Sequence, residues 1–193
     1  MIFTVIDTET TGLNRKKHEI IEIAFISYIV DADGNEYVLR KYDQKIKPEA
    51  IHLASPKALE INGYAEEKWA EAIPFQEAYP TIQKAITESD FLIGQNLIFD
   101  LNFIHEMCER NKLKEIKYPP YVDTKSMADE LKWAGVLQKT RMDYLCEHFK
   151  VQWTGEAHTA LADCERTLKV FEKLQDEVDG FEFYTFEDPY RAY

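Results

Sequence analysis

The first six residues, MIFTVI, are the feature that most limits how this chain of 193 residues can fold. Successive residues of a strand point to opposite faces of a sheet, and here both faces are mostly apolar. A strand that is apolar on both faces is typical of the centre of a covered sheet. The sequence therefore predicts a central strand at residues 1–6, which runs directly into Asp7, Thr8 and Glu9.

The rest of the chain predicts an α/β domain with a mixed sheet. Two more long strands are expected at residues 20–30 and 37–46, joined by a turn at Asp33-Gly34. After Pro48 the pattern becomes helical and then alternates between helices and short strands. Helices are predicted at residues 55–63, 75–87, within 95–113, at 124–133, 142–148 and 159–175, and short strands at 91–94 and 121–122.

Composition narrows the class of protein. Apolar residues make up 45% of the chain, which predicts one folded domain, here placed at residues 1–175. Acids outnumber bases 35 to 23, and the net charge of −12 argues against a non-specific nucleic-acid coat protein or a membrane-surface binder. The last eighteen residues, 176–193, form an acidic tail rich in aromatic side chains.

The cysteines and the first residues of the chain indicate the cellular compartment in which the protein is expected. Three well-separated cysteines, Cys108, Cys146 and Cys164, form no Cys-x-x-Cys motif and suit reduced thiols. No basic and apolar leader precedes Asp7, and Glu22 interrupts the apolar run at residues 20–30. We therefore expect a cytoplasmic protein, or one in the host cytoplasm if a phage encodes it, without a membrane span.

Carboxylates follow two of the predicted strands. Asp7 and Glu9 share one face of their strand, and Gly12 allows a tight turn after them. Asp100 follows the strand at 91–94; a plain helix start with Asn96 as N-cap is the alternative. Ligands in open α/β sheets gather at such strand ends, so Asp100 is expected near Asp7.

Asp163 and His158 lie at the start of the last predicted helix. Small residues on the flank of that helix near Asp163 would let it approach the sheet. His158 can face the same site only from the preceding loop, because five residues on a regular helix turn through roughly 140°. A surface or core histidine is the plain alternative for His158.

Four acids in one place repel each other, and divalent cations remove this penalty. Oxygen ligands without a cysteine or histidine cluster indicate Mg²⁺ or Mn²⁺ rather than Zn²⁺. Two such ions would clamp a scissile phosphate, and a histidine could accept the proton of the attacking water. The four acids therefore predict a two-metal site for phosphodiester chemistry, with His158 as its base.

Taken together, the segments DTETTGL (residues 7–13), NLIFD (96–100) and HTALAD (158–163) resemble the three ordered motifs of the DEDDh exonucleases, the DnaQ-like branch of the RNase H-like superfamily. The resemblance covers roughly residues 1–174. It implies a five-stranded mixed sheet flanked by helices and a metal-dependent 3′→5′ exonuclease that releases nucleoside 5′-monophosphates. It assigns Asp7, Glu9 and Asp163 as metal ligands, Asp100 as the fourth acid and His158 as general base.

The same resemblance suggests residues that bind substrate. Leu13 matches an apolar side chain that packs on terminal bases, and Phe99 lies beside that pocket; each also has a plain core interpretation. Asn62 replaces the histidine of an Ile-His-Gly-Ile segment, and Gln95 stands where many members have His. The complete expected set is Thr8, Thr10, Leu13, Asn62, Asn96 and Phe99. Asp123 is expected to be structural.

The Thr-Thr-Gly-Leu segment resembles members that proofread DNA, so we expect single-stranded DNA or a frayed 3′ end as substrate, in replication or repair, with RNA as the alternative. Scattered basic residues predict a distributive, salt-sensitive enzyme. A catalytically silent nucleic-acid-binding or scaffolding protein of the same fold is the alternative from another class. For the tail at 176–193, two interpretations stay open: its rings complete the core, or they dock a polymerase or another replication protein.

Overall fold

The computed structural model describes residues 1–153, 158–178 and 180–186. Five strands form one mixed sheet in the order β3-β2-β1-β4-β5. β1 pairs antiparallel with β2 and parallel with β4, while β2–β3 is antiparallel and β4–β5 is parallel. The strands are β1 (Ile2–Thr10), β2 (Ile20–Val30), β3 (Glu36–Lys45), β4 (Phe91–Gly94) and β5 (Tyr121–Asp123).

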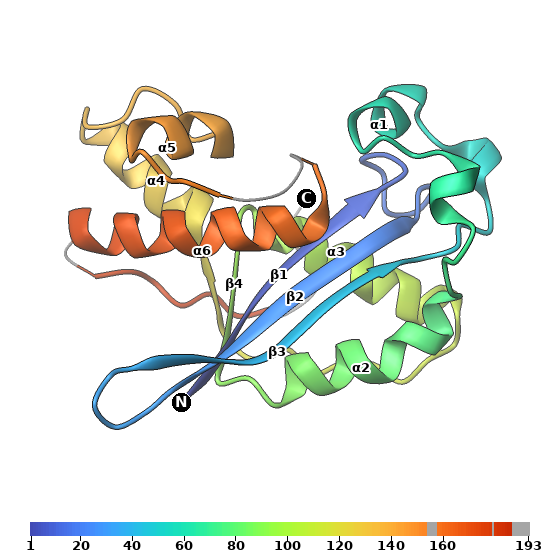
Figure 1. Cartoon of the computed structure of the whole chain (residues 1–193), viewed down its shortest axis with the longest axis horizontal. Coiled ribbons are helices and arrows are strands. Elements are labelled where there is room, and N and C mark those ends of the chain that lie inside the picture. Colours follow the sequence, from blue (N-terminus) through green and yellow to red (C-terminus); the bar gives the residue numbers. More distant parts are fainter. Residues whose placement is uncertain (154–157, 179, 187–193) are drawn as a thin grey trace.

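Helices cover both faces of this sheet (Figure 1). Helices α4 (Thr124–Trp133), α5 (Met142–His148) and α6 (Ala160–Glu177) pack on the face that carries Phe3 and Val5. Helices α2 (Phe75–Thr87) and α3 (Leu97–Arg110) pack on the face that carries Ile6. Because β1 is buried on both sides, it needs apolar residues at odd and even positions alike, as its sequence provides. The short elements η1 (Ile51–Leu53), α1 (Pro56–Ile61) and η2 (Glu66–Trp69) link β3 to α2.

The expected RNase H-like fold, a five-stranded mixed sheet between helices, is confirmed. One boundary differs in a way that matters for the site: β1 does not end at Ile6 but continues to Thr10. Asp7 and Glu9 therefore stay in the ladder, opposite Ala24 and Glu22 of β2. Within the described ranges, no helix combines the length and the apolarity needed to cross a lipid bilayer.

The cap expected at Asn96 differs from the structure. Ser55 and Asn96 occupy the N-cap positions of α1 and α3, but neither side chain accepts a capping hydrogen bond. Asn96 has a left-handed backbone, and its N–H donates to the carboxylate of Asp123 at 2.8 Å. The same Asp123 oxygen caps α4 through the N–H of Lys125 at 2.9 Å, which fits the structural role expected for Asp123. All three cysteines are free, as expected, and the structure buries them.

The described part of the tail lies along β5, the edge strand. Tyr184 exchanges two backbone hydrogen bonds with Tyr121, of 2.8 and 2.9 Å. Phe181 contacts the ring of Phe171, with centroids 5.4 Å apart, and Phe186 contacts Tyr118 at 4.5 Å. These contacts favour the interpretation in which the rings complete the core. Residues 187–193, which include Tyr190 and Tyr193, lie outside the described residues, and the boundary at residue 175 stays a prediction.

A chain that ends at Glu177 is expected to be less stable than the full chain. It loses the half-buried rings of Phe181 and Phe186 and exposes the edge of β5. A loss of about 3 kcal/mol for two such side chains corresponds to a Tm lower by about 6–12 °C in a chain of this size. Differential scanning calorimetry of the two chains checks this, and an unchanged Tm would instead favour a tail that serves docking.

Candidate active site

Strand β1 presents Asp7 and Glu9 on the face that α6 covers. They alternate with Thr8, which points to the opposite face, toward α3. The strand register shifts between Glu9 and Thr10, so that Glu9 pairs with Glu22 and Thr10 with Ile20. In the turn that follows, a Cβ atom on Gly12 would lie 2.4 Å from the ring of His18, so only glycine fits there.

Asp100 reaches the site from α3, the helix that follows β4. Its carboxylate accepts hydrogen bonds from the N–H of Thr8 at 2.9 Å and from the Thr8 hydroxyl at 2.5 Å. The parallel pairing of β1 with β4 puts the carboxyl ends of both strands at one edge of the sheet. Thr8 thus joins the central strand to Asp100, and the side chain of Asp100 is buried.

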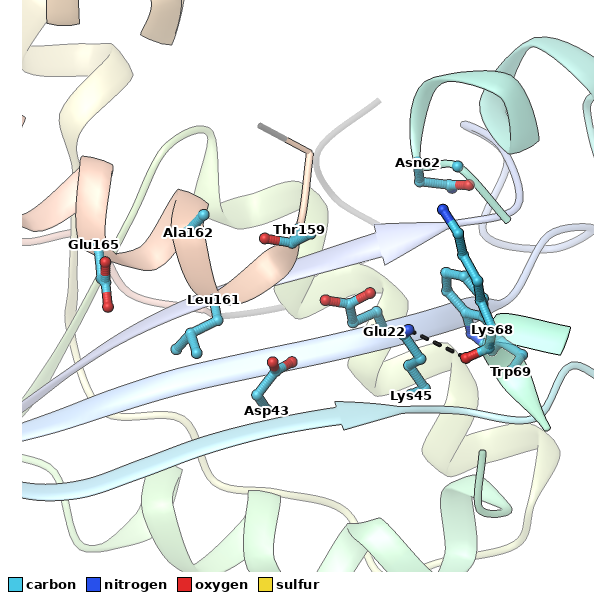
Figure 2. A pocket seen from close by; sticks show the side chains of 11 residues that line it. Glu22, Asp43, Lys45, Asn62, Lys68, Trp69, Thr159, Leu161, Ala162 and Glu165 are labelled. Carbon is cyan, nitrogen blue, oxygen red and sulfur yellow. Dashed lines mark hydrogen bonds between the residues drawn. The ribbon is translucent and has the colours of Figure 1, made fainter. Parts of the chain in front are cut away.

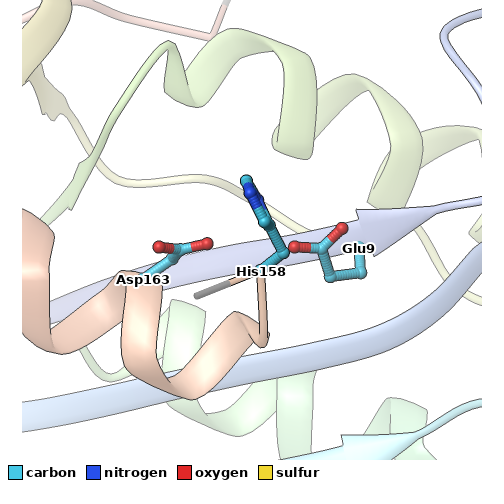
Figure 3. A group of neighbouring side chains, drawn as sticks. All are labelled: Glu9, His158 and Asp163. Atoms are coloured by element: carbon cyan, nitrogen blue, oxygen red, sulfur yellow. The ribbon is translucent and has the colours of Figure 1, made fainter. Parts of the chain in front are cut away.

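His158 and Asp163 come from α6 and the residues just before it. One ligand atom from each of Glu9, His158 and Asp163 lies within 4.8 Å of the others, and Figure 3 shows the imidazole between the two carboxylates. His158 is exposed and has a left-handed backbone with φ of 65°. That conformation is uncommon for a residue with a side chain and recurs at functional sites. The loop geometry expected for His158 is therefore present.

The cluster raises the pKa values of its own acids. Burial, together with Asp163, Glu22 and Asp100, raises the pKa of Glu9 to about 8. Burial raises the pKa of Asp100 to about 7 against the opposing hydrogen bonds from Thr8. The pKa of Asp7 is raised well above its ordinary value by burial and then by Asp100 and Asp163. For Asp163, burial raises the pKa, whereas Arg166 lowers it.

The carboxylates and the imidazole of this cluster are suitable ligands for a divalent cation. Four carboxylates that repel each other, one of them buried and three half-buried, are costly to ionise unless a positive charge lies among them. Carboxylate oxygens are the ligands that Mg²⁺ and Mn²⁺ prefer, and the imidazole of His158 adds one nitrogen. Asp7, Glu9, Asp100 and Asp163 are the residues that would hold such an ion.

The surface is hollowed at the acids and again beside them. Asp7, His158 and Asp163 line a pocket of about 190 Å³ together with Gln95 and Met142. A larger cleft of about 510 Å³ lies between α6 and the segment around Asn62, with Glu22 and Asp43 at its floor (Figure 2). The cleft is large enough for part of a nucleotide chain.

The expected substrate residues lie in different surroundings. Leu13 is 85% exposed, so its plain core interpretation is wrong, whereas Phe99 is half-buried against Phe103. The amide of Asn62 donates to the carbonyl of Thr10 at 3.1 Å, at the end of β1. The hydroxyls of Thr8 and Thr10 are both engaged within the protein, with Asp100 and with the carbonyl of Gly12. The side chain of Asn96 is exposed.

Two charged residues beside the site were not predicted from the sequence. Glu22 is buried opposite Glu9, and it accepts a hydrogen bond from the N–H of Ala160 at 3.2 Å, at the first turn of α6. Arg166 is buried on α6 and bonds to Asp163 at 2.7 Å. The available signal for Glu22 was a charged residue inside the apolar run at 20–30. For Arg166, no sequence signal separated it from a surface arginine.

The fold and the carboxylate cluster define a DEDDh-type nuclease of RNase H-like architecture. The sequence matches the exonuclease family RNase_T over residues 4–171. It is 30% identical to ribonuclease T of Shewanella frigidimarina over 179 residues, which cover 86% of this chain and 79% of that one. The identity to ribonuclease T of Haemophilus influenzae is also 30%, with 86% and 76% covered.

Solved structures agree on the fold. The nuclease domain of 3′hExo, a DEDDh family member solved bound to rAMP, superposes with a TM-score of 0.72 at 16% identity, covering 95% of this chain and 96% of that one. Exonuclease X, solved with 5′ overhanging duplex DNA, gives a TM-score of 0.65 at 24% identity, covering 92% and 93%. The chain belongs to the RNase_T exonuclease family and is a 3′→5′ exonuclease of the DEDDh type, a class of enzymes that depends on divalent metal ions.

The metal-free protein is expected to lose stability as the pH rises from about 5 to about 9. Burial and the neighbouring acids raise the pKa of Glu9 from 4.5 to about 8, and burial, followed by Asp43, raises the pKa of Glu22 from 4.5 to about 7. Between the unfolded and the folded pKa of each glutamate, the folded state binds more protons than the unfolded chain. The free energy of unfolding therefore falls as the pH rises.

Thermal unfolding in EDTA across this pH range measures the effect. Saturating Mg²⁺ is expected to flatten the slope, because the cation replaces the protons on the carboxylates. A Tm that rises from acid to alkaline pH without metal would contradict this prediction.

Proposed function

We propose that the enzyme removes nucleotides from single-stranded 3′ ends, with two Mg²⁺ or Mn²⁺ ions held by Asp7, Glu9, Asp100 and Asp163. The observation that carries this proposal is the convergence of Glu9, His158 and Asp163, whose ligand atoms lie within 4.8 Å of one another. When bound, the ions supply the positive charge that offsets the carboxylates and the scissile phosphate.

The residues of the chain have separate tasks in this proposal. His158, which is exposed at the pocket, accepts the proton of the attacking water. Thr8 holds Asp100 in place through two hydrogen bonds. Leu13, exposed beyond Gly12, packs on the terminal base of the substrate. Asn62 borders the cleft where the single-stranded nucleic acid enters. Asn96 precedes α3, and Phe99 lies in its first turn, next to Asp100 in the sequence.

We propose RNA as the first substrate, because the relatives at 30% identity are ribonucleases T. Single-stranded DNA is the second candidate, supported by the Thr-Thr-Gly-Leu segment. Roles in replication, proofreading or repair, and a polymerase partner for the tail, stay predictions from the sequence.

Parallel assays with 3′- and 5′-labelled RNA, single-stranded DNA and duplex DNA test the proposal in Mg²⁺. We expect nucleoside 5′-monophosphates from 3′-labelled single strands, and no early loss of a 5′ label. Release from 5′ ends, or equal activity in EDTA, would overturn it. Faster degradation of single-stranded DNA than of RNA would reverse the order of the two substrates.

A further inference from the structure

Arg166 is a buried cation beside the proposed metal site. It lies one turn after Asp163 on α6 and is only 1% exposed. Its Nη1 donates to Oδ1 of Asp163 at 2.7 Å, and its Nη2 donates to Oδ1 of Asp143 on α5. The ring of Trp153 covers the guanidinium, with its centroid 4.6 Å from Cζ. The side chain is thus fixed by two carboxylates and one aromatic ring.

This burial argues against one plain role for an arginine in a nuclease. Arg166 lies at the wall of the pocket that holds Asp7 and His158, but a guanidinium that binds a substrate phosphate must be accessible, and Arg166 is only 1% exposed. A purely structural tie between α5 and α6 would explain the bond to Asp143, whose side chain is 69% exposed. It would not require the second bond, which engages Asp163 at the candidate site.

The bond from Arg166 engages one of the two oxygens of Asp163. A guanidinium is charged at every accessible pH and holds carboxylates in a fixed planar geometry. An oxygen that accepts this charge-assisted bond is a poor additional ligand for a cation, which leaves the second oxygen for the metal. Mg²⁺ accepts single oxygens in a strict octahedron, whereas Ca²⁺ takes six to eight ligands and readily binds both oxygens of a carboxylate.

We propose that Arg166 is a positioning residue that limits Asp163 to one bond with a bound cation, and that it thereby favours Mg²⁺ over Ca²⁺ at the site. This inference rests on the proposed role of Asp163 as a metal ligand. Arg166 acts through Asp163 and touches neither substrate nor metal. Its effect should therefore be on the choice of cation rather than only on stability.

The ratio of the Ca²⁺ affinity to the Mg²⁺ affinity isolates this effect. Loss of Arg166 also removes a positive charge, which strengthens the binding of any cation, but both ions carry the same charge, so that contribution cancels in the ratio. Isothermal titration calorimetry without substrate gives both affinities, and the rise of Tm with each ion is a second readout. In Arg166→Met we expect the ratio to increase about tenfold, within the range for groups that orient metal ligands.

Val170→Ala is the matched control, because Val170 is fully buried in the core on the same helix, two turns after Asp163. It should lower the Tm and leave the ratio of affinities unchanged. If Arg166→Met does not fold, Arg166→Lys keeps the cation without the planar fork, and we expect about a threefold increase.

An unchanged ratio in a folded Arg166 variant would overturn this inference while the proposed function stands. If the wild-type protein binds neither ion at millimolar concentration, the proposed metal site itself is wrong. An equal change in Val170→Ala would assign the effect to general loosening of α6 and also overturn the inference.

Discussion

Asp7→Asn is expected to remove nearly all Mg²⁺-dependent nucleotide release and, at the same time, to stabilise the metal-free protein. A carboxylate that binds the metal contributes several kcal/mol to stabilising the charge of the transition state, so its loss lowers kcat roughly a thousandfold. In the absence of metal, loss of solvation around the half-buried Asp7 raises its pKa, and the nearby carboxylates of Asp100, Asp163 and Glu9 raise it further. A neutral amide avoids both the desolvation of a charge and that repulsion.

Two measurements on Asp7→Asn test the expected loss of activity and the expected gain in stability. Nucleotide release from a labelled single strand gives kcat, and calorimetry in EDTA at pH 8 gives the Tm. Asp176→Asn, at an exposed position near the end of α6, is the control and should change neither. Retained activity would remove Asp7 from the site, and a lower Tm in EDTA would show that repulsion does not dominate around it.

His158→Ala is expected to lower kcat by about 10²–10⁴-fold, the usual contribution of a general base. If His158 only transfers protons, the affinity for Mg²⁺ should change little, because the four carboxylates remain. The imidazole lies close enough to Glu9 and Asp163 to serve as a ligand instead, and calorimetric titration with Mg²⁺ distinguishes the two roles.

A second histidine serves as the control for this variant. His148→Ala, an exposed histidine on α5, is the control. A large loss of Mg²⁺ affinity in His158→Ala would identify a ligand and contradict the role of base.

Local sequence signals predicted the elements well, because each depends on neighbouring residues. The strand at 91–94 and the helices at 75–87 and 142–148 have the predicted bounds. The end of β1 was wrong, since polar residues were taken to end the strand. Asp7 and Glu9 remain in the ladder because β2 runs beside them, with Glu22 opposite Glu9.

Long-range contacts explain what could not be predicted at the site. The ordered motifs indicated the four acids and His158, and the structure brings them together. Glu22 takes its position from the N–H of Ala160, which is 138 residues away in the chain. Arg166 is positioned in part by Asp143 of another helix. No periodicity or local spacing contains such pairings.

The hairpin between β2 and β3 offers a place to attach the enzyme to a surface or a dye. Its turn is closed by Asp31, which accepts hydrogen bonds from the N–H groups of Asp33 and Asn35, and a Cβ atom on Gly34 would meet no other atom within 4 Å. Figure 1 shows this hairpin at the end of the sheet opposite α1. Because the three native cysteines are buried, a thiol introduced by Asp33→Cys would be readily labelled. An enzyme tethered there would keep its carboxylate edge open to long strands in solution.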